Sequence, residues 1–205
     1  NGYKDEESPE NSILNRYQTE EWKGWMQFIF LLYHYMYAVE VYNCIRVMIT
    51  CYVWLTGFGN YMFFHKTNDY SLPRILQMLW RLNFLVLFLC LTHGNRYILY
   101  YICPLHTYYF LMVLVDMYIG KDRNHSKWWM RTKLGVLAII IYIVWDCENY
   151  FGIFNLTHKF FLSDESVEGA RMGTMWEWYF RSALDHWSAL LGMVFAINYP
   201  IIILW

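Results

Sequence analysis

Long runs without a charged residue are the feature of this 205-residue sequence that most restricts its fold. Within Gln18 to Asn60, one such run extends from Gly24 to Val39 and is interrupted only by His34. After a short polar segment, a second run extends from Val47 to Phe64. A hydrocarbon core of about 30 Å requires roughly 20 mostly apolar residues per helix, and a helix satisfies its own backbone hydrogen bonds there. The pattern therefore predicts two membrane-spanning helices joined by a polar turn.

The composition supports a membrane setting. The chain is 58% hydrophobic and 21% aromatic, whereas a soluble domain averages about 45–50% apolar residues. Tyrosine and tryptophan suit the boundary between lipid and water, because each has an apolar body and a polar tip. A net charge of −1 gives no general attraction to nucleic acid. We therefore expect the lipid bilayer, and not a nucleic acid, as the surrounding partner.

Taken along the whole chain, the apolar runs predict an all-α, polytopic transmembrane helix bundle with about six spans. The expected spans are 24–43, 46–64, 74–92, 97–119, 132–149 and 184–205. Residues 1–17 are polar and acidic and are expected to form a linker or tail, and 18–205 to be part of one membrane domain. The chain begins without Met and stops inside an apolar run, so we interpret it as a piece of a larger protein.

Lysine and arginine in the short loops predict the orientation. Most of them fall on the side of the bundle that holds the N-terminal end. The positive-inside rule then puts this end in the cytosol and the connection around 151–173 in the lumen. Asn155, in an Asn-Leu-Thr sequon, is a glycosylation candidate on the lumenal side, whereas the sequon at Asn124 falls on the cytosolic side.

His34 is the first functional candidate. It lies about ten residues from Gly24, so a rise of roughly 1.5 Å per residue puts it near the middle of the first span. An imidazole at that depth is expensive unless it has a task or a partner. The alternative is a structural histidine that is hydrogen-bonded to a neighbouring helix through Tyr33 or Tyr37.

Arg46 and Arg81 are candidate binding residues. Glu40, Asn43 and Arg46 follow one another at intervals of three, so they can line a polar vestibule beneath His34. The alternative is a solvated turn with an internal Glu40–Arg46 pair. Arg81 lies with Asn83 in an otherwise apolar segment, where an arginine should face protein, water or an anion.

Four further candidates lie in the second half of the chain. Glu177, Arg181 and Asp185 are spaced at i, i+4 and i+8, which favours a ladder on one helix face. His106 follows Pro104, whose ring can open a kink where polar groups gather. No Cys-x-x-Cys pair or His/Cys spacing indicates a zinc site, so no metal is expected.

Several ordered blocks of this sequence resemble one family. The blocks are LNRYQTEEWKGWMQ (14–27), YVWLTGFGN (52–60), WRLNFLV (80–86), YYICPLHT (100–107), EWYFRSALD (177–185) and GMVFA (192–196). They resemble the Cas1p-type membrane O-acetyltransferases, which include the fungal capsule acetylation protein, the plant reduced-wall-acetylation proteins and the animal sialic acid O-acetyltransferase. The sequence of the block YYICPLHT resembles the plant members more than the animal ones.

The resemblance implies a multi-pass Golgi membrane enzyme, an O-acyltransferase that acetylates glycan hydroxyls on polysaccharides or glycoconjugates, with acetyl-CoA as donor. Family members also have the dipeptide Tyr-His at the position of Tyr33 and His34, which favours a role of His34 as general base or as acetyl acceptor. An acetyl-CoA donor brings phosphates that Arg81 can bind. Alternatively, Arg81 forms an ion pair with Glu177 or Asp185 that only stabilises the packing of the helices. The resemblance also favours Glu177, Arg181 and Asp185 as borders of the active cavity, whereas His186 departs from the family pattern.

Two other functions remain open from the sequence. A transporter or channel for an acetyl donor or solute would use the same intramembrane histidine and arginine without making bonds. A non-catalytic membrane scaffold would pass acetyl groups to partner acetyltransferases. The sequence does not specify the acceptor sugar.

Overall fold

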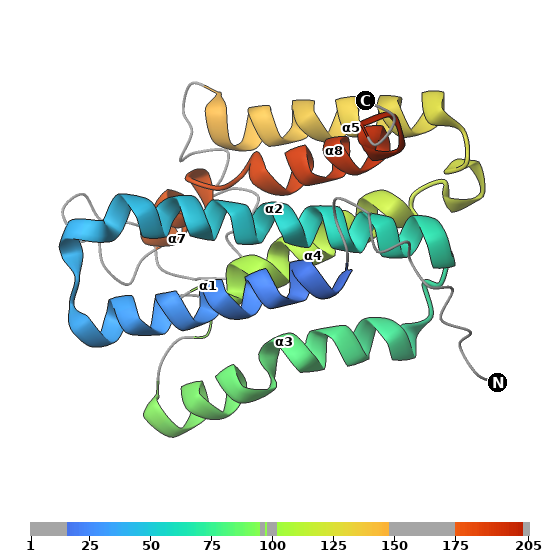
Figure 1. Cartoon of the computed structure of the whole chain (residues 1–205). Helices are drawn as coiled ribbons and strands as arrows, with labels where there is room; N and C mark the ends of the chain where they lie inside the picture. The colour runs from blue at the N-terminus through green and yellow to red at the C-terminus, as the bar shows by residue number, and fades with distance from the viewer. Residues whose placement is uncertain (1–15, 95–96, 98–101, 148–174, 203–205) are drawn as a thin grey trace.

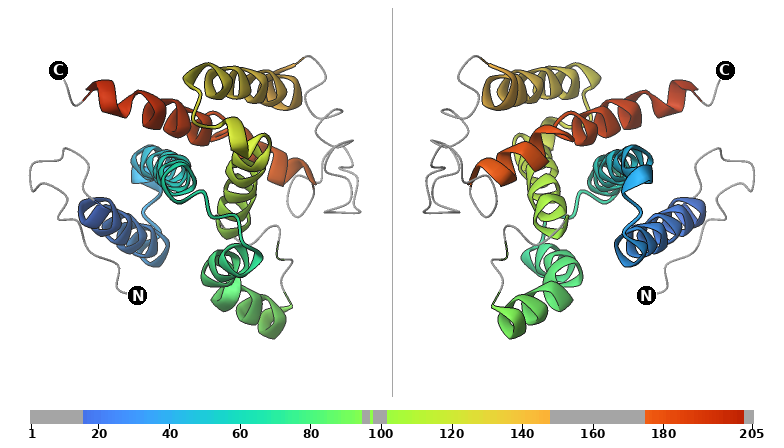
Figure 2. Two further views of the ribbon diagram at one scale, coloured as in Figure 1. Left: turned by 90° about the vertical axis from the view of Figure 1, so that its right-hand side faces the viewer. Right: turned by 90° about the vertical axis from the view of Figure 1, so that its left-hand side faces the viewer.

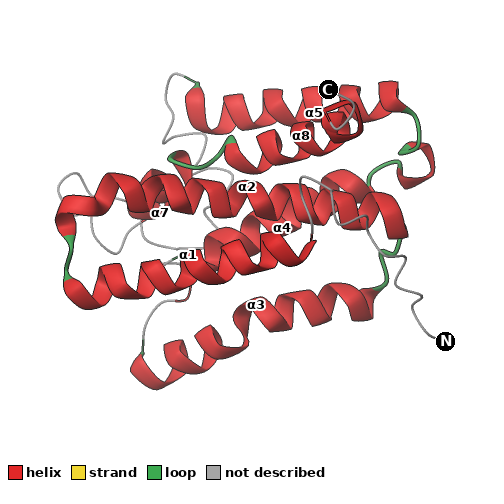
Figure 3. Cartoon of the chain, viewed as in Figure 1, coloured by secondary structure: helices red, strands yellow, loops and turns green. Residues whose placement is uncertain are grey.

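The computed structural model describes residues 16–94, 97, 102–147 and 175–202 (Figure 1). Every regular element in this part of the chain is a helix (Figure 3). The expected all-α architecture is therefore confirmed. Helix α2 (Tyr42–Thr67) runs through the middle of the bundle, with α5 (Lys127–Ile141) and α8 (Ser188–Ile202) on one side and α1 (Arg16–Met36) on the other (Figure 1). Helix α4 (Cys103–Tyr118) lies beside α2, and α3 (Leu72–His93) lies outermost, on the side opposite α5 (Figure 2).

The first two long helices form an antiparallel hairpin. Helix α1 (Arg16–Met36) ends at Tyr37, whose φ of +50° is left-handed, and a short 3-10 turn η1 (Val39–Val41) leads into α2 (Tyr42–Thr67). Gln27 donates from Nε2 to the Tyr52 hydroxyl over 2.8 Å and fixes the register of the pair. The turn thus lies at 37–41, several residues earlier than the expected break between 43 and 46.

Helices α3 (Leu72–His93) and α4 (Cys103–Tyr118) follow. The α2–α3 turn is built from polar residues: Asn68 is left-handed at φ +50°, and the Ser71 amide donates to Asp69 Oδ1 over 3.0 Å. This backbone hydrogen bond, with a weaker contribution from the Ser71 side chain, lowers the pKa of Asp69. A hydrogen bond from an aspartate side chain to the amide two residues further on stabilises a turn of this kind.

Five helical segments follow α4 in the described part of the chain. A 3-10 turn η3 (Lys121–Arg123) precedes α5 (Lys127–Ile141), which continues directly into a π-helical turn η4 (Tyr142–Asp146). Helices α7 (Met175–Ala183) and α8 (Ser188–Ile202) end the described chain. The π turn sets the direction in which the side chains of Trp145 and Asp146 leave the helix.

Helices α2 and α8 approach each other at two glycines. A Cβ atom added to Gly57 would lie 2.2 Å from the backbone oxygen of Ala189, and one added to Gly192 would lie 2.3 Å from that of Trp54. Only glycine leaves room for backbones this close, a packing mode common between membrane helices. Both glycines belong to the sequence blocks 52–60 and 192–196.

Aromatic side chains fill the space beside this contact. Trp54 stacks on Phe58 at a centroid distance of 5.7 Å and meets Phe195 of α8 edge-on at 5.0 Å. Phe58 in turn meets Tyr199 at 5.8 Å. Such pairs contribute about 0.5–1.5 kcal/mol each beyond the area that they bury. The glycines and the aromatic cluster together fix α8 across α2.

Among the described residues, three helical segments are long and apolar enough to cross a membrane: Val39–Thr67, Leu72–His93 and Lys127–Asp146. They contain most of the expected spans 46–64, 74–92 and 132–149. The segment Leu72–His93 is only 6% buried over its most apolar window, and Leu85 and Leu91 on it are 66% and 80% exposed. Apolar faces of this extent are covered by lipid or by other protein, which agrees with a membrane bundle.

Candidate functional site

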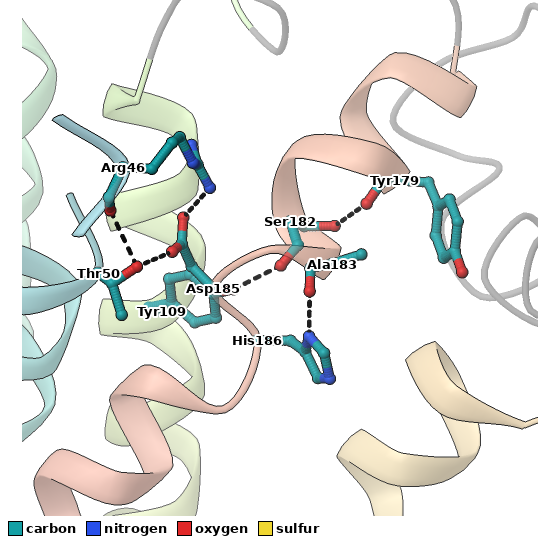
Figure 4. Close-up of polar contacts among 8 residues, drawn as sticks. All are labelled: Arg46, Thr50, Tyr109, Tyr179, Ser182, Ala183, Asp185 and His186. Carbon is teal, nitrogen blue, oxygen red and sulfur yellow. Dashed lines mark hydrogen bonds and ion pairs between the residues drawn. The ribbon is translucent and has the colours of Figure 1, made fainter. Parts of the chain in front are cut away.

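A buried polar cluster joins α2 to the turn between α7 and α8 (Figure 4). Arg46 donates from Nη2 to Oδ2 of Asp185 over 2.8 Å, and the Thr50 hydroxyl donates to Oδ1 over 2.6 Å. Arg46 and Thr50 are four residues apart on α2 and therefore share a face. The Asp185 side chain is fully buried, whereas that of Arg46 is 22% exposed. Two hydrogen-bond donors, one of which is a cation, thus compensate a carboxylate whose isolated burial would cost several kcal/mol.

Ser182 links three helical segments beside this cluster. The Trp145 indole of η4 donates to the Ser182 hydroxyl over 3.0 Å, and this hydroxyl donates to the Tyr179 carbonyl over 3.0 Å. The Tyr109 hydroxyl of α4 donates to the Ser182 carbonyl over 3.2 Å. Ser182 and Tyr109 are fully buried. These bonds hold the end of α7 against α4 and η4, and so determine where Asp185 lies.

The π turn after α5 adds a second carboxylate to this region. Asp146 Oδ2 accepts a hydrogen bond from the Trp187 indole over 3.0 Å and lies 2.9 Å from Nε2 of His186. The other ring nitrogen of His186 contacts the Ala183 carbonyl (Figure 4). Because both of its ring nitrogens are engaged, His186 serves as a link between η4 and the α7–α8 turn. Single π turns often occur at functional sites.

His106 lies buried between α2 and α4. Its Nδ1 is 3.5 Å from the Thr56 hydroxyl, and its ring meets that of Tyr52 edge-on at 4.5 Å. Nε2 is buried and has no hydrogen-bond partner within the described residues. Pro104 lies in the first turn of α4, where its missing N–H costs no hydrogen bond and the rest of α4 continues without a kink from this proline.

His34 is in the last turn of α1 and is exposed, with its ring edge-on to Tyr33 at 5.2 Å. The expected position halfway along a span therefore differs from the structure, because α1 ends at Met36. The Gln27–Tyr52 pairing brings His34, seven residues further along α1, to the level of the α2 turn that contains Arg46. His34 thus lies at the same end of the bundle as the Arg46–Asp185 pair.

The alternative pairings weighed for the two arginines do not form. Arg46 bonds to Asp185 instead of Glu40, which lies exposed in η1. Arg81 is exposed on α3, and the acids weighed as its partners bond elsewhere: Asp185 to Arg46, and Glu177 to Arg181. Arg81 therefore does not form a structural ion pair with either acid.

Asn83 has a structural position between α3 and α4. Its Nδ2 donates to the Leu79 carbonyl over 2.9 Å, and its Oδ1 accepts from the hydroxyls of Thr107, over 3.1 Å, and Tyr97. Buried side-chain amides are normally satisfied in this way. Asn83 thus does not share the exposed surroundings of Arg81, although the two are neighbours in sequence.

The ladder expected at Glu177, Arg181 and Asp185 forms only in part. Arg181 pairs with Glu177 on α7, but α7 ends at Ala183 and the chain turns before α8. Asp185 therefore leaves the helical stripe and reaches Arg46. Asn155 lies outside the described residues. Asn124 is buried, and its amide donates to the Met117 carbonyl over 2.8 Å and accepts from Lys133 over 3.1 Å.

Sequence reasoning missed four residues of this region: Thr50, Ser182, Trp145 and Asp146. A signal existed for Thr50, which is four residues from Arg46, and for Asp146, a charge directly after an apolar run. No local signal marks Ser182 or Trp145, because their partners lie on distant segments. Within the described ranges, no group of three or more His, Cys, Asp or Glu side chains gathers in a way that could hold a metal ion.

Comparisons with known proteins identify the family. The model of the ten-transmembrane acyltransferase domain found in Cas1p matches residues 2–203. The N-acetylneuraminate (7)9-O-acetyltransferase of Danio rerio is 37% identical over 209 aligned positions, which cover 95% of this chain and 26% of that protein. The chain thus spans about a quarter of the length of this relative. No solved structure matches significantly. The nearer resemblance to the plant branch stays a prediction. The chain belongs to the Cas1p family of membrane acyltransferases.

Proposed function

We propose that this chain is part of a membrane O-acetyltransferase that moves acetyl groups from acetyl-CoA to glycan hydroxyls. The observation that carries the proposal is the fully buried Asp185 with its two donors, Arg46 and Thr50. Arg46 lies in a segment that is long and apolar enough to cross a membrane, where ionisable side chains are costly and mark functional sites by default. The family match and the acetyltransferase named as a relative support acetyl transfer as the chemistry that we propose for this cluster.

In this proposal His34 is the catalytic group. Its exposed position at the end of the bundle that holds Arg46 and Asp185 leaves it open to a substrate. The imidazole takes the proton of the acceptor hydroxyl while the hydroxyl oxygen attacks the acetyl carbonyl, and the thiolate of CoA leaves. Alternatively, the ring accepts the acetyl group before passing it on.

The other candidates divide between the two substrates. Arg81, exposed on α3, has the guanidinium chemistry to bind donor phosphates. Arg46, held by Asp185 at the His34 end of α2, serves the acceptor, and His106 of α4 lies against Thr56 further along α2 as a second polar group for a substrate. Asn83 supports the Arg81 segment through its bonds to α4. Glu177 and Arg181 border the cluster through α7.

We further propose a Golgi membrane location with the N-terminal end of the chain in the cytosol, a glycan acceptor in the lumen, and partner glycan acetyltransferases that receive acetyl groups from this protein. Loss of a glycan on Asn155→Gln, detected as an endoglycosidase-sensitive mobility shift, tests this orientation. Retention of the full glycan in this variant, with loss in an Asn124→Gln variant, contradicts it.

The activity is tested with the purified parent protein, acetyl-CoA and two acceptors, an N-acetylneuraminate glycoconjugate and a neutral polysaccharide. Release of free CoA together with an acetylated glycan is the expected result. Uptake of acetyl-CoA into vesicles without acetylation would instead identify a transporter.

His34→Ala then tests the catalytic assignment, with His93→Ala as the matched control, because His93 is also an exposed histidine in the last turn of its helix. We expect a loss of acetylation of about 10²–10⁴-fold in the first variant only, the usual contribution of a general base. Normal acetylation in His34→Ala, at normal membrane level, would indicate a scaffold or a different base.

A further inference from the structure

One buried nitrogen at the α2–α4 interface lacks a hydrogen bond. His106 is 6% exposed, and its Nε2 has no partner within the described residues. A buried polar atom that loses its hydrogen bonds to water costs about 1–3 kcal/mol unless something replaces them. A ligand that forms a hydrogen bond with this imidazole nitrogen therefore offsets the free-energy cost of burying it.

The neighbours of His106 determine which ring nitrogen can accept. The Thr56 hydroxyl donates to the Tyr52 carbonyl over 3.0 Å, so its hydrogen is already used and its lone pair faces Nδ1 of His106 at 3.5 Å. This arrangement favours the tautomer with the proton on Nδ1. Nε2 then carries a lone pair and can accept a hydrogen bond.

His106 is connected to the surroundings of the Arg46–Asp185 pair through α4. It lies three residues from Tyr109, so the two share a face of α4, and the Tyr109 hydroxyl donates to the Ser182 carbonyl near Asp185. Thr56, which contacts His106, follows Thr50, which bonds to Asp185, after six residues on α2, a rise of about 9 Å. That distance is comparable with the length of one or two sugar units, so a ligand held near Arg46 is long enough to reach the level of His106.

We infer that His106 binds the glycan acceptor by accepting a hydrogen bond at Nε2 from a sugar hydroxyl. This inference rests on the proposed acetyltransferase function. It assigns His106 to acceptor binding and leaves proton removal to His34. Nε2 is sealed in the structure, and the Tyr52 ring that meets His106 is held by Gln27 of α1. Opening of the Gln27–Tyr52 contact therefore gives a ligand access to the nitrogen.

Two substitutions separate acceptor binding from a purely structural role. In His106→Asn the side-chain amide can occupy the position of Nδ1 and keep the contact with Thr56, but nothing replaces Nε2. In His106→Gln the longer amide reaches the position of Nε2 and can accept a hydrogen bond without being a base. Both variants are made in the parent protein, with the membrane level and thermal midpoint measured beside the kinetics.

With acetyl-CoA saturating and the N-acetylneuraminate glycoconjugate varied, we expect His106→Asn to raise the acceptor KM about three- to tenfold, the size of one neutral hydrogen bond. His106→Gln should stay within about twofold of the parent, and the donor KM should not change in either variant. Normal kinetics in His106→Asn with impaired folding of His106→Gln would show a helix contact only and overturn the inference.

A fall in kcat of both variants with an unchanged acceptor KM would also overturn acceptor binding, and would move proton transfer from His34 to His106. These outcomes differ from failure of the proposed function itself. In that event the parent protein transfers no acetyl group to either acceptor, and both proposals fall together.

Discussion

Arg46 and Asp185, 139 positions apart in the sequence, form a hydrogen-bonded ion pair of 2.8 Å between α2 and the α7–α8 turn. The carboxylate is fully buried and the guanidinium is partly exposed. Thr50 supplies a second hydrogen bond to the same carboxylate. The pair fastens the C-terminal helices to the N-terminal hairpin at the end of the bundle where His34 also lies.

Removal of one partner of this pair should destabilise the protein strongly. In Arg46→Met, Asp185 stays buried with only the Thr50 hydroxyl as a donor, and we expect a loss of about 3 kcal/mol in the free energy of unfolding. Thermal unfolding in detergent measures the loss. The control is Arg181→Met, whose i, i+4 pair with Glu177 is partly exposed and contributes about 0.2–0.5 kcal/mol. Equal midpoints for the two variants would show that the buried pair does not fasten the bundle.

The close approach of α2 and α8 predicts different outcomes for two neighbouring glycines. Gly57→Ala places a methyl group against the Ala189 backbone, and should lower stability by about 1–3 kcal/mol through overpacking. Gly59→Ala meets no atom within 4 Å, and should be neutral or stabilising by up to about 1 kcal/mol, because alanine favours a helix. The thermal midpoints of the two variants, measured side by side, check this. A Gly57→Ala protein as stable as Gly59→Ala would contradict the contact.

Ser182 should be sensitive to loss of its hydroxyl. Ser182→Ala leaves the buried Trp145 indole without its acceptor at 3.0 Å, which should cost about 1–3 kcal/mol. Thr132→Ala is the control, since its hydroxyl bonds only to its own helix at an exposed position. A change in the surroundings of Trp145, measured as a shift of the tryptophan emission spectrum, should accompany the fall in stability. An unchanged midpoint and emission spectrum in Ser182→Ala would remove Ser182 as a link between η4 and α7.

The sequon at Asn124 should matter for folding and not for glycosylation. Asn124→Ala removes the bonds to the Met117 carbonyl and to the buried Lys133, and should lower stability by about 1–3 kcal/mol. Ser126→Ala destroys the same sequon but no side-chain hydrogen bond at the start of α5, so it should leave stability within about 0.5 kcal/mol. A glycan on Asn124, seen as a mobility shift that Ser126→Ala abolishes, would disprove this prediction.

The sequence alone determined that the chain is a helical membrane bundle. Runs such as Val47 to Phe64 are long enough to cross lipid, and the solvent itself then requires helices, because backbone groups find no other partner there. Local spacing also predicted the Glu177–Arg181 pair correctly, since residues four apart on a helix always face one another.

Tertiary structure decided which of the polar residues meet. Asp185 fits the same local spacing as Arg181, yet the end of α7 at Ala183 turns it away to Arg46. Gly57 and Gly192 occur in recognisable blocks, but only the crossing of α2 and α8 shows that each leaves room for the other helix. Periodicity reports the direction of a side chain on its own helix. The partner it finds depends on how distant helices pack, and that packing energy is shared among many residues of the whole bundle.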